Sequence, residues 1–216
     1  LQDRIFIGIT GSISVGKSTF GKKITKYIFS IKKNAHYVDL DKLVHAIYNF
    51  SGSKEHLGLK ISFLNRFGKG ILNSNGDIDR NFLRESLYED ESHLRWLKEK
   101  LNYPISYELR KYISDKKGII FLDGTMLAEN NMLDVVNYNI IFLSIDEEKQ
   151  LERLMERDNI SKEVAKKKIS LAGDTSSKRT ILRGDKRIKY IEFYMENWDQ
   201  REIKKCGDKI ISFFNL

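Results

Sequence analysis

Gly11-Ser12-Ile13-Ser14-Val15-Gly16-Lys17-Ser18 is the stretch that decides the fold of this 216-residue chain. It matches the phosphate-loop pattern G-x-x-x-x-G-K-[ST], whose glycines let the backbone approach a phosphate. The apolar run Ile5–Ile9 before it predicts a buried strand, and the apolar spacing over 18–31 predicts a helix. Strand, glycine turn and helix in this order indicate an anion site at a helix N-terminus. The stretch therefore predicts that the protein binds a nucleoside triphosphate.

Two side chains of the loop carry chemistry. Lys17 can reach the β- and γ-phosphates and stabilise the transferring group, and the Ser18 hydroxyl can hold Mg²⁺. A Gly/Ser-rich turn without a ligand is the alternative, which the flanking strand and helix disfavour. We expect ATP contacts from the whole loop and the next residue: Gly11, Ser12, Ile13, Ser14, Val15, Gly16, Lys17, Ser18 and Thr19.

Composition narrows the class of protein. The hydrophobic fraction of 41% and the charged fraction of 31% are typical of a globular protein. A single cysteine, Cys206, excludes an internal disulfide and suits a reducing compartment. The run Ile5–Ile9 is too short for a membrane span or a signal segment, so we expect a cytoplasmic protein without a membrane partner.

The net charge of +8 suggests a polyanionic partner, but the lysines lie in scattered pairs that solvated helix ends explain. We therefore expect no stable nucleic-acid complex. A monomer or a weak homo-oligomer is the expected state.

Short apolar runs alternate with helical patterns along the chain, which predicts an α/β fold with a five-stranded parallel sheet covered on both faces. The expected strands lie near 4–10, 35–39, 118–123, 138–145 and 208–214.

The interval from about 52 to 115 contains only helical patterns and predicts an inserted helical lobe. Asp79 can cap one helix of this lobe. A second pattern runs from Leu94 to Ile113, and Pro104 is expected to bend or interrupt it. Such a lobe beside a phosphate loop is a natural place for a second substrate.

Carboxylates follow two of the expected strands, at the edge of the sheet where ligands bind in open α/β folds. Asp39 and Asp41 follow the second strand, and either could accept the proton of an attacking hydroxyl. Helix capping is the alternative for Asp39. Asp123 ends the third strand and could support Mg²⁺, or it could be a turn residue.

Two arginines lie one turn apart on the helix expected after the fourth strand. Arg153 and Arg157 share a face, and two guanidinium groups near a triphosphate would stabilise its charge. A solvated helix face with Glu152 and Glu156 as partners is the alternative. The four histidines show no metal-ligand spacing. His45, four residues after Asp41, could face the same cleft.

Several stretches, in this order, resemble the dephospho-coenzyme A kinase family, the last enzymes of coenzyme A synthesis. The matching stretches are Ile9–Thr19, Val38–His45, Gly76–Arg80 followed by Leu83, Leu101–Ile105, Leu122–Glu129 and Gln150–Asp158. They cover residues 4 to about 172. The chain departs from the family's pattern at Tyr103, Thr125 and Ala172, and the segment 173–206 matches it poorly.

The resemblance implies a single phosphate-loop kinase domain over residues 1–216, with strand order 2-3-1-4-5, an acceptor lobe at about 52–115 and a lid at about 147–185. It implies ATP and Mg²⁺ as cofactors and dephospho-coenzyme A as the substrate, phosphorylated on its ribose 3′-hydroxyl. By resemblance, Asp41 would activate that hydroxyl and Arg157 would contact the ATP phosphates. His45, Arg80 and Tyr103 would belong to the acceptor site.

Three other functions remain as alternatives. A kinase of the same fold could act on a nucleoside or nucleotide instead. A GTPase should show an Asn-Lys-x-Asp signature after a strand, which the sequence lacks. A nucleic-acid-binding module, suggested by the charge, should show an aromatic-studded basic strand, which is also missing.

Overall fold

The computed structural model describes residues 4–49, 54–125, 127, 132–194 and 196–216. The chain forms two compact units. The first comprises Leu1–Asp39 and Lys116–Leu216, and the second is Leu40–Asp115. The second unit is thus an insertion between two halves of the first, and each is described below by itself.

The first unit is built on a parallel sheet. Its strands are β1 (Arg4–Thr10), β2 (Ala35–Asp39), β3 (Gly118–Asp123), β4 (Asn139–Ser144) and β5 (Lys189–Tyr194). They pair in the order β2-β3-β1-β4-β5, and every pairing is parallel. The β-branched and aromatic runs of the inner strands are buried, as sheets covered on both faces require. The predicted fold class and strand order are therefore confirmed.

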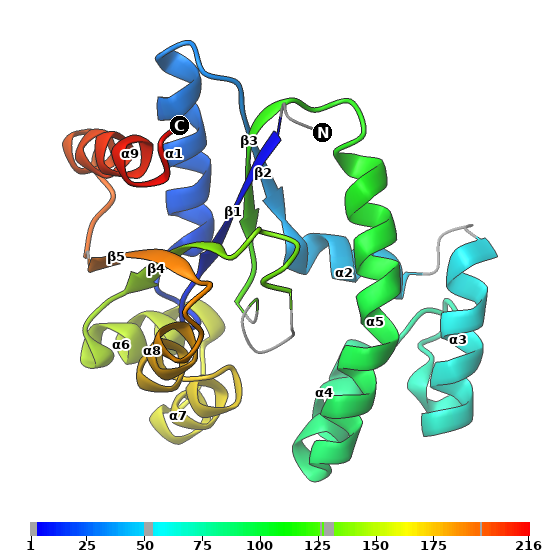
Figure 1. Ribbon diagram of the computed structural model, residues 1–216. Coiled ribbons are helices and arrows are strands. Elements are labelled where there is room, and N and C mark those ends of the chain that lie inside the picture. The colour runs from blue at the N-terminus through cyan, green and yellow to red at the C-terminus, as the bar shows by residue number, and fades with distance from the viewer. Residues whose placement is uncertain (1–3, 50–53, 126, 128–131, 195) are drawn as a thin grey trace. The chain divides into compact units, whose positions relative to one another are not determined.

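Five helices complete this unit: α1 (Lys17–Ser30), α6 (Glu147–Asp158), α7 (Lys162–Leu171), α8 (Thr175–Gly184) and α9 (Gln200–Phe214). Helices α1 and α9 lie together against one face of the sheet, while α6, α7 and α8 lie beyond β4 and β5 (Figure 1). Residues from the strands and from α1 and α9 form one core, in which the Phe20 ring packs at a tilt against the rings of Phe193 and Trp198. This core fixes the phosphate loop between β1 and α1.

The fifth strand was predicted in the wrong place. Residues 208–214 belong to α9, and the strand is Lys189–Tyr194. The apolar run near the end of the chain continues a helical spacing through Ile203, Cys206, Gly207, Ile210 and Phe214, all of which are buried. A run of seven residues is too short to show that period by itself, which is why it resembled a strand.

The true β5 was hidden by a charged residue in its middle. Glu192 lies between Ile191 and Phe193, which interrupts the apolar pattern. In the folded chain its carboxylate accepts hydrogen bonds from Ser144 on β4 and from Arg179 on α8. These partners make the half-buried charge acceptable in a strand.

The second unit is helical, as expected. It contains α2 (Leu40–Tyr48), α3 (Lys54–Phe67), a 3₁₀ turn, η1 (Lys69–Ile71), α4 (Arg80–Glu89) and α5 (Glu91–Tyr112). Asp79 caps α4, accepting from the backbone N–H groups of Asn81 and Phe82, as predicted. Pro104 does not interrupt α5, which runs through it as one helix. Phe63 packs edge-on against Tyr48 and Trp96 in the centre of this unit.

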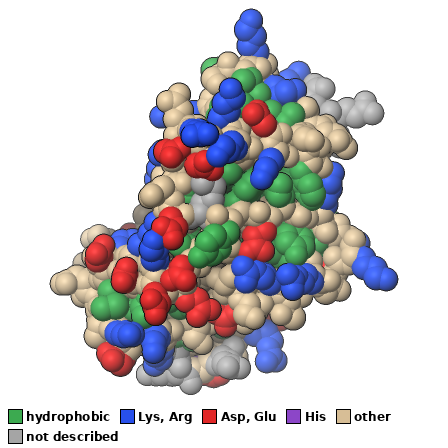
Figure 2. All heavy atoms as spheres, turned by 90° about the vertical axis from the view of Figure 1, so that its left-hand side faces the viewer, with side chains coloured by type: hydrophobic (Ala, Val, Ile, Leu, Met, Phe, Trp, Pro, Cys, Tyr) green, Lys and Arg blue, Asp and Glu red, His purple; other side chains and the backbone are tan. Residues whose placement is uncertain are grey.

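Two further features of the structure concern membrane-spanning helices and the distribution of charge on the surface. No helix in the described part of the chain is long and apolar enough to cross a membrane. On the face shown in Figure 2, basic and acidic side chains lie interspersed instead of forming one basic patch. An interspersed pattern attracts a polyanion less than a single-sign surface of the same net charge would.

Candidate active site

The phosphate loop adopts a backbone that only particular residues allow. Gly11 has φ 148° and Gly16 has φ 90°, and Ser14 between them has φ 61°. A Cβ on Gly11 would lie 2.3 Å from the carbonyl oxygen of Leu143. The Ser14 hydroxyl oxygen is buried without a hydrogen-bond partner. The loop is therefore a closely fitted backbone cradle with an unsatisfied polar group, which fits an anion such as a triphosphate.

Lys17 begins α1 directly after the loop. Its side chain is buried, and its ammonium donates to the carbonyl oxygen of Ser12 over 2.9 Å. The charge is thus held across the loop at the positive end of a helix, where consecutive N–H groups also gather. A phosphate in the loop would meet both features.

The side-chain amide of Gln150 links α6 to the phosphate loop by hydrogen bonds. This buried residue of α6 donates its amide N–H groups to the Ser12 hydroxyl and to the Ile13 carbonyl, both over 2.8 Å. It therefore couples the helix that carries Arg153 and Arg157 to the loop. The sequence placed Gln150 on that helix but gave it no role, because 138 residues separate it from Ser12.

Asp123 lies beside the loop at the carboxyl end of β3. The Ser18 hydroxyl donates to its Oδ2 over 2.8 Å, and the Tyr37 hydroxyl donates to the same oxygen over 2.6 Å. Burial raises the pKa of Asp123, while nearby Lys17 and the two hydrogen bonds oppose that rise. Asp39 faces Asp123 across the β2–β3 pairing. Both strands therefore end in a carboxylate at this edge of the sheet, as the sequence predicts for Asp39 and Asp123 separately.

The chemistry of these side chains fits Mg²⁺, which prefers oxygen ligands. Because the Ser18 hydroxyl points its hydrogen at Asp123, its lone pairs remain available for a cation. Among the described residues no group of three or more His, Cys, Asp and Glu side chains gathers as a metal cage. Mg²⁺ usually keeps several waters and binds substrate phosphates, so it needs few protein ligands.

The two arginines of α6 have different contacts. Arg153 donates to the backbone carbonyl of Glu196, and Arg157 forms an ion pair with Asp158, with 2.8 Å between Nε and Oδ1. Lys168 on α7 contacts the same carboxylate over 2.7 Å. The contact from Arg157 is the main reason that the pKa of Asp158 falls to about 2. The sequence offered Glu152 and Glu156 as partners of these arginines and identified neither Asp158 nor the Glu196 carbonyl.

A buried lysine also reaches this edge of the sheet. Lys178 on α8 is 1% exposed, and its ammonium donates to the Thr125 carbonyl over 2.7 Å. The Thr10 hydroxyl donates to the same carbonyl over 3.2 Å. The segment 173–206, which the sequence left without a role, thus supplies side chains next to the loop. Trp198 is another, since its indole nitrogen would lie 2.7 Å from a Cβ on Gly16.

The expected acceptor residues lie in the second unit. Asp41 and His45 are one turn apart on α2, where Asp41 is exposed and His45 is half-buried. Arg80 begins α4 and is exposed. Tyr103 on α5 is 69% exposed, with its ring 6.3 Å from that of Tyr107. The ATP-side and acceptor-side candidates therefore belong to different compact units of the chain.

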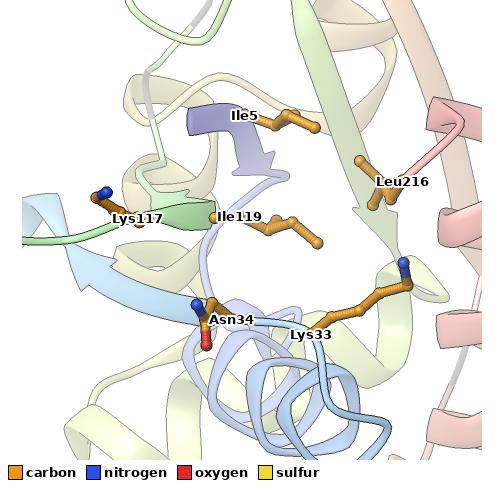
Figure 3. Close-up of a pocket in the computed structure, with 7 residues that line it drawn as sticks. Ile5, Lys33, Asn34, Lys117, Ile119 and Leu216 are labelled. Atoms are coloured by element: carbon orange, nitrogen blue, oxygen red, sulfur yellow. The ribbon is translucent and has the colours of Figure 1, made fainter. Parts of the chain in front are cut away.

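A separate pocket of about 420 Å³ lies at the amino ends of β1 and β3, the edge opposite the phosphate loop. Ile5, Ile119 and Leu216 face its hollow in Figure 3. Lys33, Asn34, Lys117 and Gly118 complete its lining. Its place at the other end of the strands separates it from the nucleotide site.

The model of the family described as dephospho-CoA kinase matches residues 5–185. The chain belongs to the dephospho-CoA kinase family. Similar sequences support this assignment to the family. The dephospho-CoA kinase of Fusobacterium nucleatum subsp. nucleatum is 31% identical over 198 residues, which are 89% of each chain. That of Streptococcus agalactiae serotype Ia is 30% identical over 167 residues, 76% of this chain and 80% of the relative.

Solved structures agree with the fold of the dephospho-CoA kinase family. A protein from Thermus thermophilus superposes with a TM-score of 0.72 at 21% identity, covering 97% of both chains. A dephospho-CoA kinase from Campylobacter jejuni superposes with a TM-score of 0.56 at 18% identity, covering 98% of this chain and 97% of that one. Of the family stretch Leu122–Glu129, Met126, Ala128 and Glu129 lie outside the described residues.

Proposed function

We propose that this protein transfers the γ-phosphoryl group of ATP to the ribose 3′-hydroxyl of dephospho-coenzyme A, giving coenzyme A and ADP. The observation that supports this most directly is the phosphate cradle, with Lys17 held across it by the Ser12 carbonyl. Membership of the dephospho-CoA kinase family supports the choice of acceptor.

The ATP side of the reaction rests on residues of the first unit. The backbone N–H groups of the loop bind the phosphates. The Lys17 ammonium stabilises the negative charge on the phosphoryl group while it is transferred. Arg157 belongs to a lid at about 147–185 that closes over the phosphates. On closure its guanidinium group leaves the Asp158 carboxylate and contacts the phosphates of ATP. Arg153 supports the nucleotide from the same helix face. Gln150 keeps the start of α6 bound to the phosphate loop during this closure, through its hydrogen bond to Ser12.

Mg²⁺ bound with ATP would neutralise charge that develops on the phosphate oxygens. Ser18 is the proposed direct ligand, through its hydroxyl oxygen. Asp123 would hold that hydroxyl and the metal's water molecules through its carboxylate, which accepts from Ser18. Both side chains come together because β3 ends beside the start of α1.

Asp41 is the proposed general base on the acceptor side. A ribose hydroxyl is a weak nucleophile, so a carboxylate that orients it and accepts its proton late in the transfer accelerates the reaction. His45, one turn later on α2, is placed to bind the same acceptor. Arg80 and Tyr103 would bind other parts of dephospho-coenzyme A within the lobe at about 52–115.

A coupled assay for ADP release tests the function. Turnover with dephospho-coenzyme A should exceed turnover with any member of a nucleoside and nucleotide panel. Preference for a panel member would show instead a kinase for another small molecule with the same fold. ADP release that no acceptor stimulates would contradict both readings.

Asp41→Asn tests the acceptor side of this mechanism. It should lower kcat by about 10² to 10⁴-fold and leave ATP affinity nearly unchanged, because it removes the base and keeps the shape. Asp39→Asn is the matched control, since Asp39 ends β2 where α2 begins and could act as a helix cap worth about 1 kcal/mol. A dead Asp39→Asn enzyme beside an active Asp41→Asn enzyme would reverse the assignment.

A further inference from the structure

We propose that Tyr37 is a positioning residue that fixes the carboxylate of Asp123 and thereby sets how strongly the enzyme binds Mg²⁺ together with ATP. The proposal rests on the proposed function in one respect, the use of ATP with Mg²⁺. It adds a residue that the phosphate-loop pattern and the family stretches do not include.

Two hydroxyl groups hold one carboxylate oxygen. Tyr37 and Ser18 donate to Oδ2 of Asp123 over 2.6 Å and 2.8 Å. A carboxylate held at one oxygen from two directions loses its freedom to turn, and Asp123 is only 4% exposed, so its neighbours also restrict it. With Oδ2 occupied, Oδ1 is the oxygen left for a metal-bound water. The orientation of this group is therefore fixed before any ligand arrives.

The sheet and α1 put the Tyr37 ring in this place. Tyr37 on β2 pairs with Phe121 on β3, so Asp123, two residues further along, projects from the same face of the sheet. On α1, Gly21 leaves room for the ring, since a Cβ there would lie 2.4 Å from Tyr37 Cε2 and 2.8 Å from Cδ2. The glycine and the tyrosine thus fit each other, and together they aim the hydroxyl at Asp123.

Packing alone does not explain why residue 37 carries a hydroxyl group. A phenylalanine would fill the space between β2 and α1 as well as a tyrosine does. A phenol placed against a buried carboxylate brings a polar group out of water, which is favourable only if the hydrogen bond is made. The position is therefore suited to a donor for Asp123, and this donor lies outside the phosphate loop.

Tyr37→Phe removes the donor and keeps the ring. Losing a partner that orients a metal ligand typically weakens metal binding by about 10 to 100-fold, and Tyr37 acts one step further out, through Asp123, so the lower end of that range applies. We expect the Mn²⁺ concentration for half-saturation of the ATP-bound enzyme, followed by electron paramagnetic resonance, to rise about tenfold. ATP affinity in EDTA, measured by calorimetry, should stay within about twofold of the native value, because the loop is untouched.

Tyr27→Phe is the matched control. Tyr27 lies on α1, and its hydroxyl also donates to an aspartate, Asp208. That pair lies between α1 and α9 and does not involve Asp123, so Mn²⁺ binding should remain native in this variant.

Gly21→Ala provides an independent perturbation, since its methyl group displaces the Tyr37 ring while the hydroxyl is kept. It should weaken Mn²⁺ binding in the same direction, and the double variant with Tyr37→Phe should show less than the sum of the two effects.

Native Mn²⁺ half-saturation in a folded Tyr37→Phe variant would overturn the proposal and leave Tyr37 as a packing residue. An equal loss of ATP affinity in EDTA would overturn it too, because the tyrosine would then support the whole loop. These binding measurements use no acceptor. A wrong acceptor assignment would therefore appear as absent turnover in the native enzyme, with the Tyr37 effect intact.

Discussion

Replacing Gly11 by alanine should deform the phosphate loop and remove most of its affinity for ATP. The new Cβ would lie 2.3 Å from the carbonyl oxygen of Leu143 on β4, about 1 Å inside ordinary contact distance. That carbonyl belongs to the backbone of a strand paired with β5, so it cannot turn away as a side chain would. The loop must therefore move.

The magnitude follows from two costs. A non-glycine residue at φ 148° is strained by about 1–3 kcal/mol, and overpacking in a filled site costs about 1–3 kcal/mol more. We expect Gly11→Ala to lower the free energy of unfolding by about 3 kcal/mol, which is about 6–12 °C in Tm for a chain of this length. A loop displaced by about 1 Å should also raise the Kd for ATP at least tenfold.

Thermal unfolding and calorimetric titration with ATP check both expectations. Gly184→Ala is the matched control, since nothing lies within 4 Å of a Cβ at the end of α8. That variant should unfold within about 2 °C of the native protein and bind ATP normally. A Gly11→Ala protein with native Tm and native ATP affinity would refute the reasoning, because the loop would then not need the glycine.

Three further predictions concern Lys17, Arg157 and the Asp158 carboxylate that Arg157 contacts. Lys17→Ala should lower kcat by at least about 10²-fold, and near-native turnover of the folded variant would contradict its role. Arg157→Ala should lower kcat more than it weakens binding of dephospho-coenzyme A, and the reverse pattern would assign this arginine to the acceptor. The pKa of Asp158 is lowered to about 2, so its pairing stabilises the fold above about pH 4 and loses that effect as pH falls toward 2. Asp158→Asn should therefore lower stability by about 1 kcal/mol at pH 7, less than the full pKa shift implies because solvent screens the pair. Its Tm deficit should shrink from pH 5 to pH 2, and a deficit independent of pH would show that the charge is not its cause.

Much of the fold could be predicted from the sequence, because its signals are local. The phosphate loop has a fixed spacing, and its flanking strand and helix show their periods within a few residues. The first four strands, the helical insertion and the cap at Asp79 were predicted for the same reason. The roles of Asp41, Arg153 and Arg157 are carried by motif positions and stay predictions until the variants are measured.

The sequence also misled where a local pattern had two interpretations. The run 208–214 is short and apolar, and it belongs to a longer helical spacing from Ile203 onward that packs against α1, where Gly207 lies close to Tyr27. Lys189–Tyr194 contains a charge, and only the contacts of Glu192 with Arg179 and Ser144 explain how it can be a strand. In both cases the partner that decides the structure lies on another element.

The site shows the same division. The sequence by itself determined that a phosphate loop lies between a strand and a helix, and it predicted which residues of that loop would meet a triphosphate. Tertiary structure alone decided what surrounds that loop: Gln150 reaches Ser12 across 138 residues of sequence, and Tyr37 reaches Asp123 across 86. No spacing rule connects such residues, because they meet through the pairing of parallel strands and the packing of helices from distant parts of the chain.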